Sequence, residues 1–158
     1  MKVIKGDLVS MALNNYFDVI VHGCNCFNTM GKGIALDIKK YFPEAYEADC
    51  LTIKGDKSKL GSYTKCTKII NVRPLVIINA YTQYTYYFTT EMDKTQPLVS
   101  YGAVKEVFTE INKDFAGRIV GIPKIGAGLA MGDWEIIKNI LDEVCTDIEL
   151  IVVEYQPK

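Results

Sequence analysis

The residues best able to do chemistry in this 158-residue chain follow an apolar run at positions 19–21. His22 is the single histidine of the chain, and Asn25 lies just beyond it. An unperturbed imidazole has a pKa of about 6.5, which suits general acid–base work, although a buried, hydrogen-bonded histidine is an equally open role. Asn25 could cap the following turn or orient a sugar hydroxyl or a water molecule with its amide.

Two glycine-containing segments, 31–33 and 126–129, each follow a buried-strand pattern and precede a helical pattern. A helix N-terminus behind such a loop offers unpaired backbone N–H groups and a partial positive charge, which suit a phosphate. Ligands of open α/β sheets bind outside the carboxyl ends of the strands. The pair of loops therefore predicts a crevice for a ligand with more than one anionic group, such as a diphosphate. Ordinary strand-to-helix turns are the alternative.

Other candidates lie at the ends of predicted elements. Asp7 follows the first strand pattern and Asp133 begins a helical pattern, so either could cap a helix. Asp7 could instead accept a hydrogen bond from an adenine amino group, and Asp133 could support catalysis. The tyrosines and the phenylalanine between positions 81 and 88, and Tyr155 after the last strand, could wall a ribose or a base or simply cover the sheet.

Composition excludes several classes of protein. The net charge is −1 and basic residues form no run, which argues against a dedicated nucleic-acid binder. The five cysteines are an odd number without a framework of spacings, which indicates free thiols in a reducing compartment. With one histidine and the close pair Cys24 and Cys26, we expect no metal site. The Cys-x₅-Arg phosphate loop of cysteine-dependent phosphatases is absent.

Hydrophobic periodicity predicts an α/β fold in which a mixed or mostly parallel sheet has helices on both faces. We expect a single domain over 1–158, with no leader or membrane-spanning segment, and therefore a cytoplasmic protein. The segment 81–93 either extends a strand or forms an aromatic flap. The predicted strands are 2–5, 18–23, 62–70, 75–79, 118–122 and 148–153, and the predicted helices are 32–42, 44–53, 97–115 and 133–144.

In this order, the motifs resemble those of the macro domain family, whose members bind ADP-ribose. The resemblance covers nearly the whole chain and implies a three-layer α/β/α sandwich around a central mixed, mostly parallel sheet. It rests on Gly6-Asp-Leu8, Val21-His-Gly-Cys-Asn25, Gly31-Lys-Gly-Ile-Ala35, Phe42-Pro43 and Pro123-Lys-Ile-Gly-Ala-Gly-Leu129 with Asp133-Trp134.

The resemblance also implies roles for these residues. Asp7 and the backbone of Leu8 would contact the adenine, and Asn25 would sit at the distal ribose. We expect a monomer that binds ADP-ribose or a derivative, with no cofactor, no membrane and no nucleic-acid partner. The diphosphate and the distal ribose would be held by Gly31, Lys32, Gly33, Ile34, Gly126, Ala127, Gly128 and Leu129.

Within the family, the segment from His22 to Cys26 is similar to the branch of the yeast-type ADP-ribose-1″-phosphate phosphatases, which have His-Ser-Cys-Asn-Cys. This implies hydrolysis of ADP-ribose-1″-phosphate to ADP-ribose and phosphate. His22 would act as the general acid–base residue or orient a water molecule, Asn25 would position the distal ribose, and Asp133 would support the attacking water.

Two departures leave other activities open. Glycohydrolase relatives have a segment similar to Asn-Phe-Pro-Thr-Lys where this chain has Asn79-Ala-Tyr-Thr-Gln83. Some also have an aspartate at the position that aligns with Ala130. Both departures weaken the case for a lysine-dependent glycohydrolase activity. Deacetylation of O-acetyl-ADP-ribose, mono-ADP-ribosyl hydrolysis and ADP-ribose binding without turnover are the alternatives.

Overall fold

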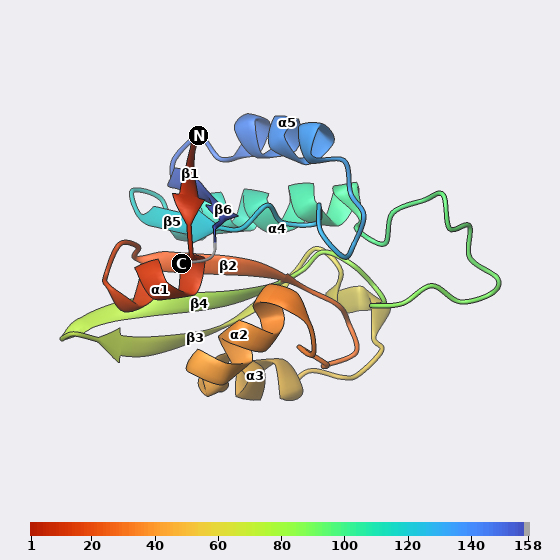
Figure 1. Cartoon of the computed structure of the whole chain (residues 1–158), viewed down its shortest axis with the longest axis horizontal. Coiled ribbons are helices and arrows are strands. Elements are labelled where there is room, and N and C mark those ends of the chain that lie inside the picture. The colour runs from red at the N-terminus through yellow and green to blue at the C-terminus, as the bar shows by residue number, and fades with distance from the viewer. Residues whose placement is uncertain (157–158) are drawn as a thin grey trace.

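The computed structural model describes residues 1–156 as a six-stranded sheet between two layers of helices (Figure 1). Every neighbouring pair of strands is parallel except β3 and β4, which are antiparallel. This is the mixed, mostly parallel sheet that the sequence predicts. Across the sheet the order is β1 (Lys2–Gly6), β6 (Glu149–Tyr155), β5 (Ile119–Ile122), β2 (Val19–Cys24), β4 (Arg73–Tyr81) and β3 (Tyr63–Ile70).

The helices divide between the two faces of the sheet (Figure 1). One face is covered by α4 (Tyr101–Asp114) and α5 (Trp134–Val144). The opposite face is covered by α1 (Leu8–Leu13), α2 (Gly33–Tyr41) and α3 (Pro43–Cys50), with the short 3₁₀ helix η1 (Lys57–Lys59) beyond them in the chain. The expected three-layer α/β/α arrangement is therefore confirmed.

Each face of the sheet has its own apolar core, because successive side chains of a strand point to opposite faces. Val21 of β2 packs with Phe108 of α4 in the first core. The preceding residue, Ile20, packs with Ile38 of α2 in the second core. Strand alternation thus decides which side chains of β2 can reach α2 and α3.

The structure corrects two predictions about helices. The helix predicted from position 97 begins at Tyr101, because Ser100 caps it: the Ser100 hydroxyl accepts from the Ala103 N–H at 3.1 Å. Helix α1 is absent from the predicted elements, because its six residues are too few to show a helical period. Its start is fixed by Asp7, whose carboxylate accepts from the Ser10 N–H at 3.0 Å.

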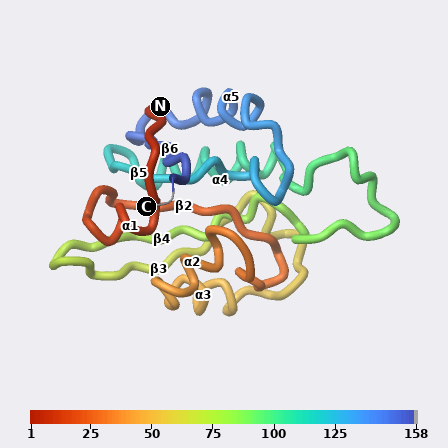
Figure 2. Tube along the Cα trace, in the orientation of Figure 1, coloured from red at the N-terminus to blue at the C-terminus, as the bar shows by residue number. Residues whose placement is uncertain are grey.

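Beyond β4 the chain leaves the body of the molecule as a long loop before returning to α4 (green in Figure 2). An isolated bridge between Gln83 and Val99 ties its two ends together. Of the two predicted forms for the aromatic segment, the structure shows a loop, since β4 ends at Tyr81. Within residues 1–156, the helices are all too short or too polar to cross a bilayer.

Candidate functional site

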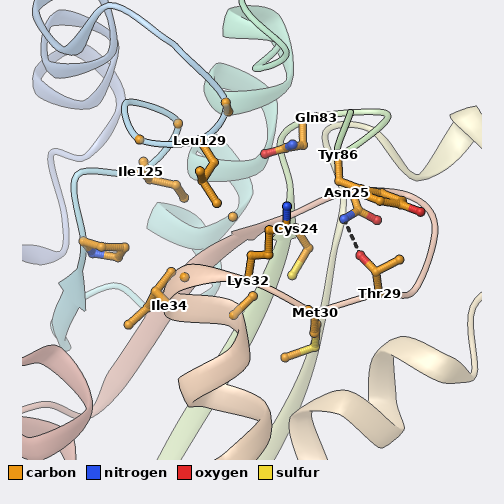
Figure 3. Close-up of a pocket in the computed structure, with 18 of the residues that line it drawn as sticks. Cys24, Asn25, Thr29, Met30, Lys32, Ile34, Gln83, Tyr86, Ile125 and Leu129 are labelled. Carbon is orange, nitrogen blue, oxygen red and sulfur yellow. Dashed lines mark hydrogen bonds between the residues drawn. The ribbon is translucent and has the colours of Figure 1, made fainter. Parts of the chain in front are cut away.

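A cavity of about 420 Å³ opens beyond the carboxyl ends of β2 and β5 (Figure 3). In that view Ile34, Ile125 and Leu129 lie on one side of it, and Asn25, Thr29 and Tyr86 lie on the other. Its position matches the ligand crevice expected of an open α/β sheet. The lining residues are Gly23, Cys24, Asn25, Thr29, Met30, Gly31, Lys32, Gly33, Ile34, Ala35, Asp49, Gln83, Tyr86, Pro123, Lys124, Ile125, Gly126, Gly128, Leu129 and Ala130.

The N-terminus of α2 lines this cavity without a side-chain cap. Lys32 stands at the capping position and makes no capping hydrogen bond, whereas α1, α4 and α5 are capped by Asp7, Ser100 and Asp133. Gly33 opens the helix with a φ of +58°, a left-handed conformation that glycine adopts at low cost. The first N–H groups of α2 are therefore available to an anionic ligand.

The second glycine loop approaches the same cavity from β5. Gly126 has a φ of +75° and accepts from the Gly132 N–H at 2.7 Å, which closes the loop. A Cβ atom at position 126 would come within 2.7 Å of Val99, so both the conformation and the space require glycine. Gly128 and Leu129 line the cavity, but Ala127 is outside the lining. The structure thus brings the two glycine loops to one cavity.

Asn25 lines the cavity from the loop after β2, and its amide holds that loop in shape. Its Oδ1 accepts from the Phe27 N–H at 2.8 Å, and its Nδ2 donates to the Thr29 hydroxyl at 2.8 Å (Figure 3). This is the turn-capping role that the sequence left open. The side chain also faces the ligand space, so contact with a sugar stays a prediction.

His22 is buried below the cavity and does not line it. Its side chain points from β2 toward the face of α3, where its Nε2 lies 2.7 Å from Oδ1 of Asn79. Because the Asn79 Nδ2 donates to the Ala45 carbonyl, Oδ1 is an acceptor and His22 carries its proton on Nε2. Burial lowers the pKa of His22 to about 4, so the imidazole is neutral near pH 7. Of the two roles that the sequence left open for His22, this position is that of the buried, hydrogen-bonded histidine, and the acid–base role would have no direct access to the cavity.

The residues predicted at the adenine also lie away from this cavity. Asp7 caps α1, and Leu8 is buried in the core beneath it. Tyr155 is 69% exposed at the end of β6. None of the three lines the cavity; Asp7 instead lines a second hollow of about 410 Å³ next to β1, together with Lys5 and Ser10.

Asp133 is the N-cap of α5, and its carboxylate accepts from the Glu135 N–H at 2.9 Å. Its own N–H donates to the Tyr101 hydroxyl at 2.9 Å. The structure therefore gives Asp133 the capping role, and it does not bring the side chain into the lining of the cavity. Among residues 1–156, His, Cys, Asp and Glu side chains form no group of three that could hold a metal ion.

Asp49, a buried carboxyl group of α3, lines the cavity and is not among the site residues predicted from the sequence. The Tyr81 hydroxyl donates to its Oδ1 at 2.7 Å. Burial raises the pKa of Asp49, while the bond from Tyr81 and the nearby Lys59 act in the opposite direction. A signal was present, because Asp49 falls at helical spacing after the buried residues Phe42 and Ala45, on the apolar face of its helix.

Lys59 is a second buried charge that the sequence analysis missed. Its Nζ donates to Asn28 Oδ1 and to the Thr52 hydroxyl, both at 2.9 Å. Asn28 belongs to the loop that presents Asn25 and has a φ of +57°. Lys59 therefore fastens the loop after β2 to the chain that follows α3, and so fixes one wall of the cavity.

The loop after β4 completes the far wall. Tyr86 lines the cavity, and its ring centroid lies 4.8 Å from that of Tyr87 and 6.5 Å from that of Phe27. Gln83 also lines it and donates from Nε2 to the Thr85 carbonyl at 2.9 Å. Part of the predicted aromatic wall is therefore present, through Tyr86.

The layered α/β fold and the cavity between the two glycine loops agree with the fold and the ligand crevice expected from the sequence. The Macro domain family model matches residues 21–141. The chain therefore belongs to the macro domain family.

Individual relatives agree with this family. An uncharacterized 17.5 kDa protein from the tk–vs intergenic region of Enterobacteria phage T4 is 35% identical over 162 residues, covering 99% of this chain and 97% of the relative. The ADP-ribose 1″-phosphate phosphatase of Debaryomyces hansenii is 29% identical over 166 residues, with coverages of 90% and 93%. A solved structure of a protein of unknown function from Bacteroides thetaiotaomicron has a TM-score of 0.76 and 28% identity, with coverages of 97% and 96%.

Proposed function

We propose that this protein binds ADP-ribose derivatives in the cavity and hydrolyses ADP-ribose-1″-phosphate to ADP-ribose and phosphate. One observation carries the proposal: the uncapped N-terminus of α2 and the 126–129 loop line the same cavity. Two sets of backbone N–H groups suit the two phosphates of a diphosphate. Lys32 and Lys124, which also line the cavity, add positive charge beside them.

The choice of the 1″-phosphate is supported by the relative from Debaryomyces hansenii, whose name specifies that activity. It is also supported by the likeness of the His22–Cys26 segment to the phosphatase branch. Asn25 would then contact the distal ribose at the side of the cavity opposite Ile34 and Leu129 (Figure 3). Backbone N–H groups would stabilise the charge that develops on the transferred phosphoryl group.

A second candidate is a protein that binds ADP-ribose without turnover. Gln83 favours it, because this residue stands where the glycohydrolase relatives have a lysine, and its amide is already bound to the Thr85 carbonyl. Deacetylation of O-acetyl-ADP-ribose and mono-ADP-ribosyl hydrolysis are further candidates that act on the same ligand.

The first test is a calorimetric titration with ADP-ribose, followed by phosphate release from ADP-ribose-1″-phosphate in the same sample. Binding with release supports the phosphatase. Binding without release supports the non-catalytic alternative or another linkage, and product analysis with O-acetyl-ADP-ribose then separates these. No binding would contradict the proposed ligand.

A charge placed in the second loop tests where the ligand binds. Nothing lies within 4 Å of a Cβ atom at Gly128, so Gly128→Glu fits without strain and adds a carboxylate beside the proposed diphosphate. We expect at least about tenfold weaker ADP-ribose binding through like-charge repulsion. Gly102→Glu is the matched control, because Gly102 is exposed in the first turn of α4 and does not line the cavity. Equal binding by both variants would place the ligand elsewhere.

A further inference from the structure

Hydrolysis of a phosphate ester needs a group that can exchange a proton at the reacting bond. Asp49 is the only carboxyl group among the cavity-lining residues described in 1–156, and no histidine lines the cavity. The sequence-predicted candidates lie elsewhere: His22 is buried below the cavity, and Asp133 caps α5. The acid–base role that the sequence predicted for His22 therefore needs another residue, and Asp49 lies where it can take that role.

The location of Asp49 within the cavity matches the proposed reacting end. Its bond partner Tyr81 is the register partner of Cys24 across β4 and β2, and Cys24 directly precedes Asn25. Asp49 thus lies on the side of Cys24 and Asn25, where the distal ribose is proposed. Its Oδ1 is held by Tyr81, and its Oδ2 makes no hydrogen bond with any described residue. The group is fixed by one oxygen and can present the other to a ligand.

A directed chain of hydrogen bonds holds Asp49 in this orientation. His22 donates to Asn79 at 2.7 Å, and Asn79 donates to the Thr64 hydroxyl at 3.0 Å. Since the Tyr81 hydroxyl donates its hydrogen bond to Asp49, the Thr64 hydroxyl must donate to the Tyr81 oxygen, at a distance of 3.0 Å. Every member is satisfied in only one direction, which fixes the rotamers of the chain.

Resting on the proposed function, we propose that Asp49 is the catalytic acid of this cavity and that Tyr81, Asn79 and His22 are its positioning residues. Protonated Asp49 donates its proton to the 1″ oxygen as the bond between that oxygen and phosphorus breaks. A water oxygen forms the new bond to phosphorus, and a proton of that water returns to Asp49. The products are ADP-ribose and inorganic phosphate, and the carboxyl group ends as it began.

The surroundings of Asp49 agree with a proton-bearing role. Burial favours the neutral carboxyl and raises its pKa, whereas the Tyr81 bond and the charge of Lys59 favour the carboxylate. For a general acid, turnover falls as the pH rises through the pKa of this group. The titratable groups that interact with Asp49 are Lys59 of η1, Tyr81 of β4, Cys24 of β2, Cys26 of the following loop and Tyr46 of α3.

Asp49→Asn tests the proposal, because asparagine keeps the shape and an acceptor for Tyr81 but cannot donate an acidic proton. We expect kcat for phosphate release to fall by about 10²- to 10⁴-fold. The Kd for ADP-ribose should stay within about threefold, since no phosphate contact is lost. Asp37→Asn, the same change on the exposed surface of α2, is the control and should match the wild type. A kcat within about threefold of wild type for Asp49→Asn would overturn the assignment.

Tyr81→Phe provides a second test, which can be used even if the Asp49→Asn variant fails to fold. It leaves the carboxyl group but removes the hydrogen bond that favours its ionised form. The descending limb of the pH–kcat profile should therefore move to higher pH. A purely structural contribution of Tyr81 would leave the pH–kcat profile unmoved, so an unmoved profile would contradict the positioning role.

Failure of the proposed function can be told apart from failure of this inference. If the wild type binds ADP-ribose but releases no phosphate, the phosphatase proposal fails. ¹³C NMR of carboxyl-labelled aspartate, with Asp49→Asn to assign the signal, then decides whether ADP-ribose shifts the titration of Asp49. A shift supports contact at the ligand's reacting end, and an unchanged titration, or no binding at all, overturns it.

Discussion

The two faces of the sheet differ in what they bury. On the face of α4 and α5, β2 and β4 contribute Val21 and Ile78 to an apolar core. On the face of α2 and α3, the neighbouring residues His22 and Asn79 form a hydrogen-bonded pair instead. Both pairs are register partners on the same two strands, so the difference lies entirely in which face each pair occupies. Both faces bury an apolar core, but on these two strands only the face of α2 and α3 also buries a polar pair, beneath the cavity.

The buried polar side chains of β2 and β4 that bond to one another all lie on one face of these strands. The side chains of His22, Asn79 and Tyr81 point from their strands toward α3. Asp49 of α3 accepts a hydrogen bond from Tyr81. Each polar group has a partner along this chain, so its burial does not leave an uncompensated desolvation cost. Changes on the two faces should therefore have different signatures: loss of stability alone on the first, and loss of stability with altered pH dependence on the second.

The largest effect on stability is expected on the apolar face. Phe108 of α4 is fully buried there, and Phe108→Ala would leave a cavity between α4 and the sheet. We expect the free energy of unfolding to fall by about 3–5 kcal/mol, measured by denaturant titration. ADP-ribose binding below the unfolding transition should be retained. A loss of less than about 1 kcal/mol would show that the core collapses around the change.

On the polar face, His22 should make stability depend on pH. Its pKa is about 4 in the folded protein against about 6.5 unfolded, so between these values the unfolded chain binds more protons. Stability is therefore lost as the pH falls through this window, by roughly 3 kcal/mol in total. Buried Asp49, with its raised pKa, acts in the opposite direction. Subtracting the pH–stability curve of His22→Gln from that of the wild type isolates the histidine, and identical slopes would contradict its burial as a neutral group.

Tyr81→Phe should have a smaller effect on stability than either of these. It leaves Thr64 and Asp49 without their shared partner, which we expect to cost about 1–3 kcal/mol in denaturant titration. Tyr16→Phe, at a side chain that is 61% exposed, is the matched control and should stay within about 0.5 kcal/mol. A double-mutant cycle with Asp49→Asn should show coupling above about 0.5 kcal/mol, and additive effects would mean that the two groups do not interact.

The smallest effect is expected at Asp133, outside both cores. Asp133→Ala removes the N-cap of α5 and should lower the free energy of unfolding by about 1 kcal/mol, while Asp133→Asn should keep the cap. The same two variants decide between the capping role seen here and the catalytic role expected from the sequence. A fall in kcat for Asp133→Asn without a change in stability would restore Asp133 to the reaction.

The sequence predicted elements with a strong period well, but it predicted a short helix and one helix start poorly. The apolar runs in β2 and β4 and the amphipathic pattern of α5 identified those elements directly. The first helix shows no period because six residues hold less than two turns, and α4 begins later than predicted because Ser100, and not Pro97, marks its start. Local signals of similar strength compete at such ends.

The candidate site divides along the same line. The two glycine loops could be predicted, because a left-handed φ at Gly33 and Gly126 is a property of the local chain. Asp49 could not be placed with comparable certainty, since its partner Tyr81 is distant in sequence and belongs to another layer. For His22 the sequence left a buried, hydrogen-bonded role and an acid–base role open, because its position beside a loop does not say how far below the cavity its side chain ends; the structure shows the buried role.

By itself, the sequence predicted the family, the order of the strands and of helices α2 to α5, and the two glycine loops that line the cavity. These depend on residue type and on short-range spacing, which the chain displays directly. Only the tertiary structure decided that His22 is buried, that Asp133 caps a helix and that Asp49 reaches the cavity. Those outcomes depend on which face of the sheet a side chain occupies and on which helix packs against it, and both are set by contacts between residues far apart in the chain.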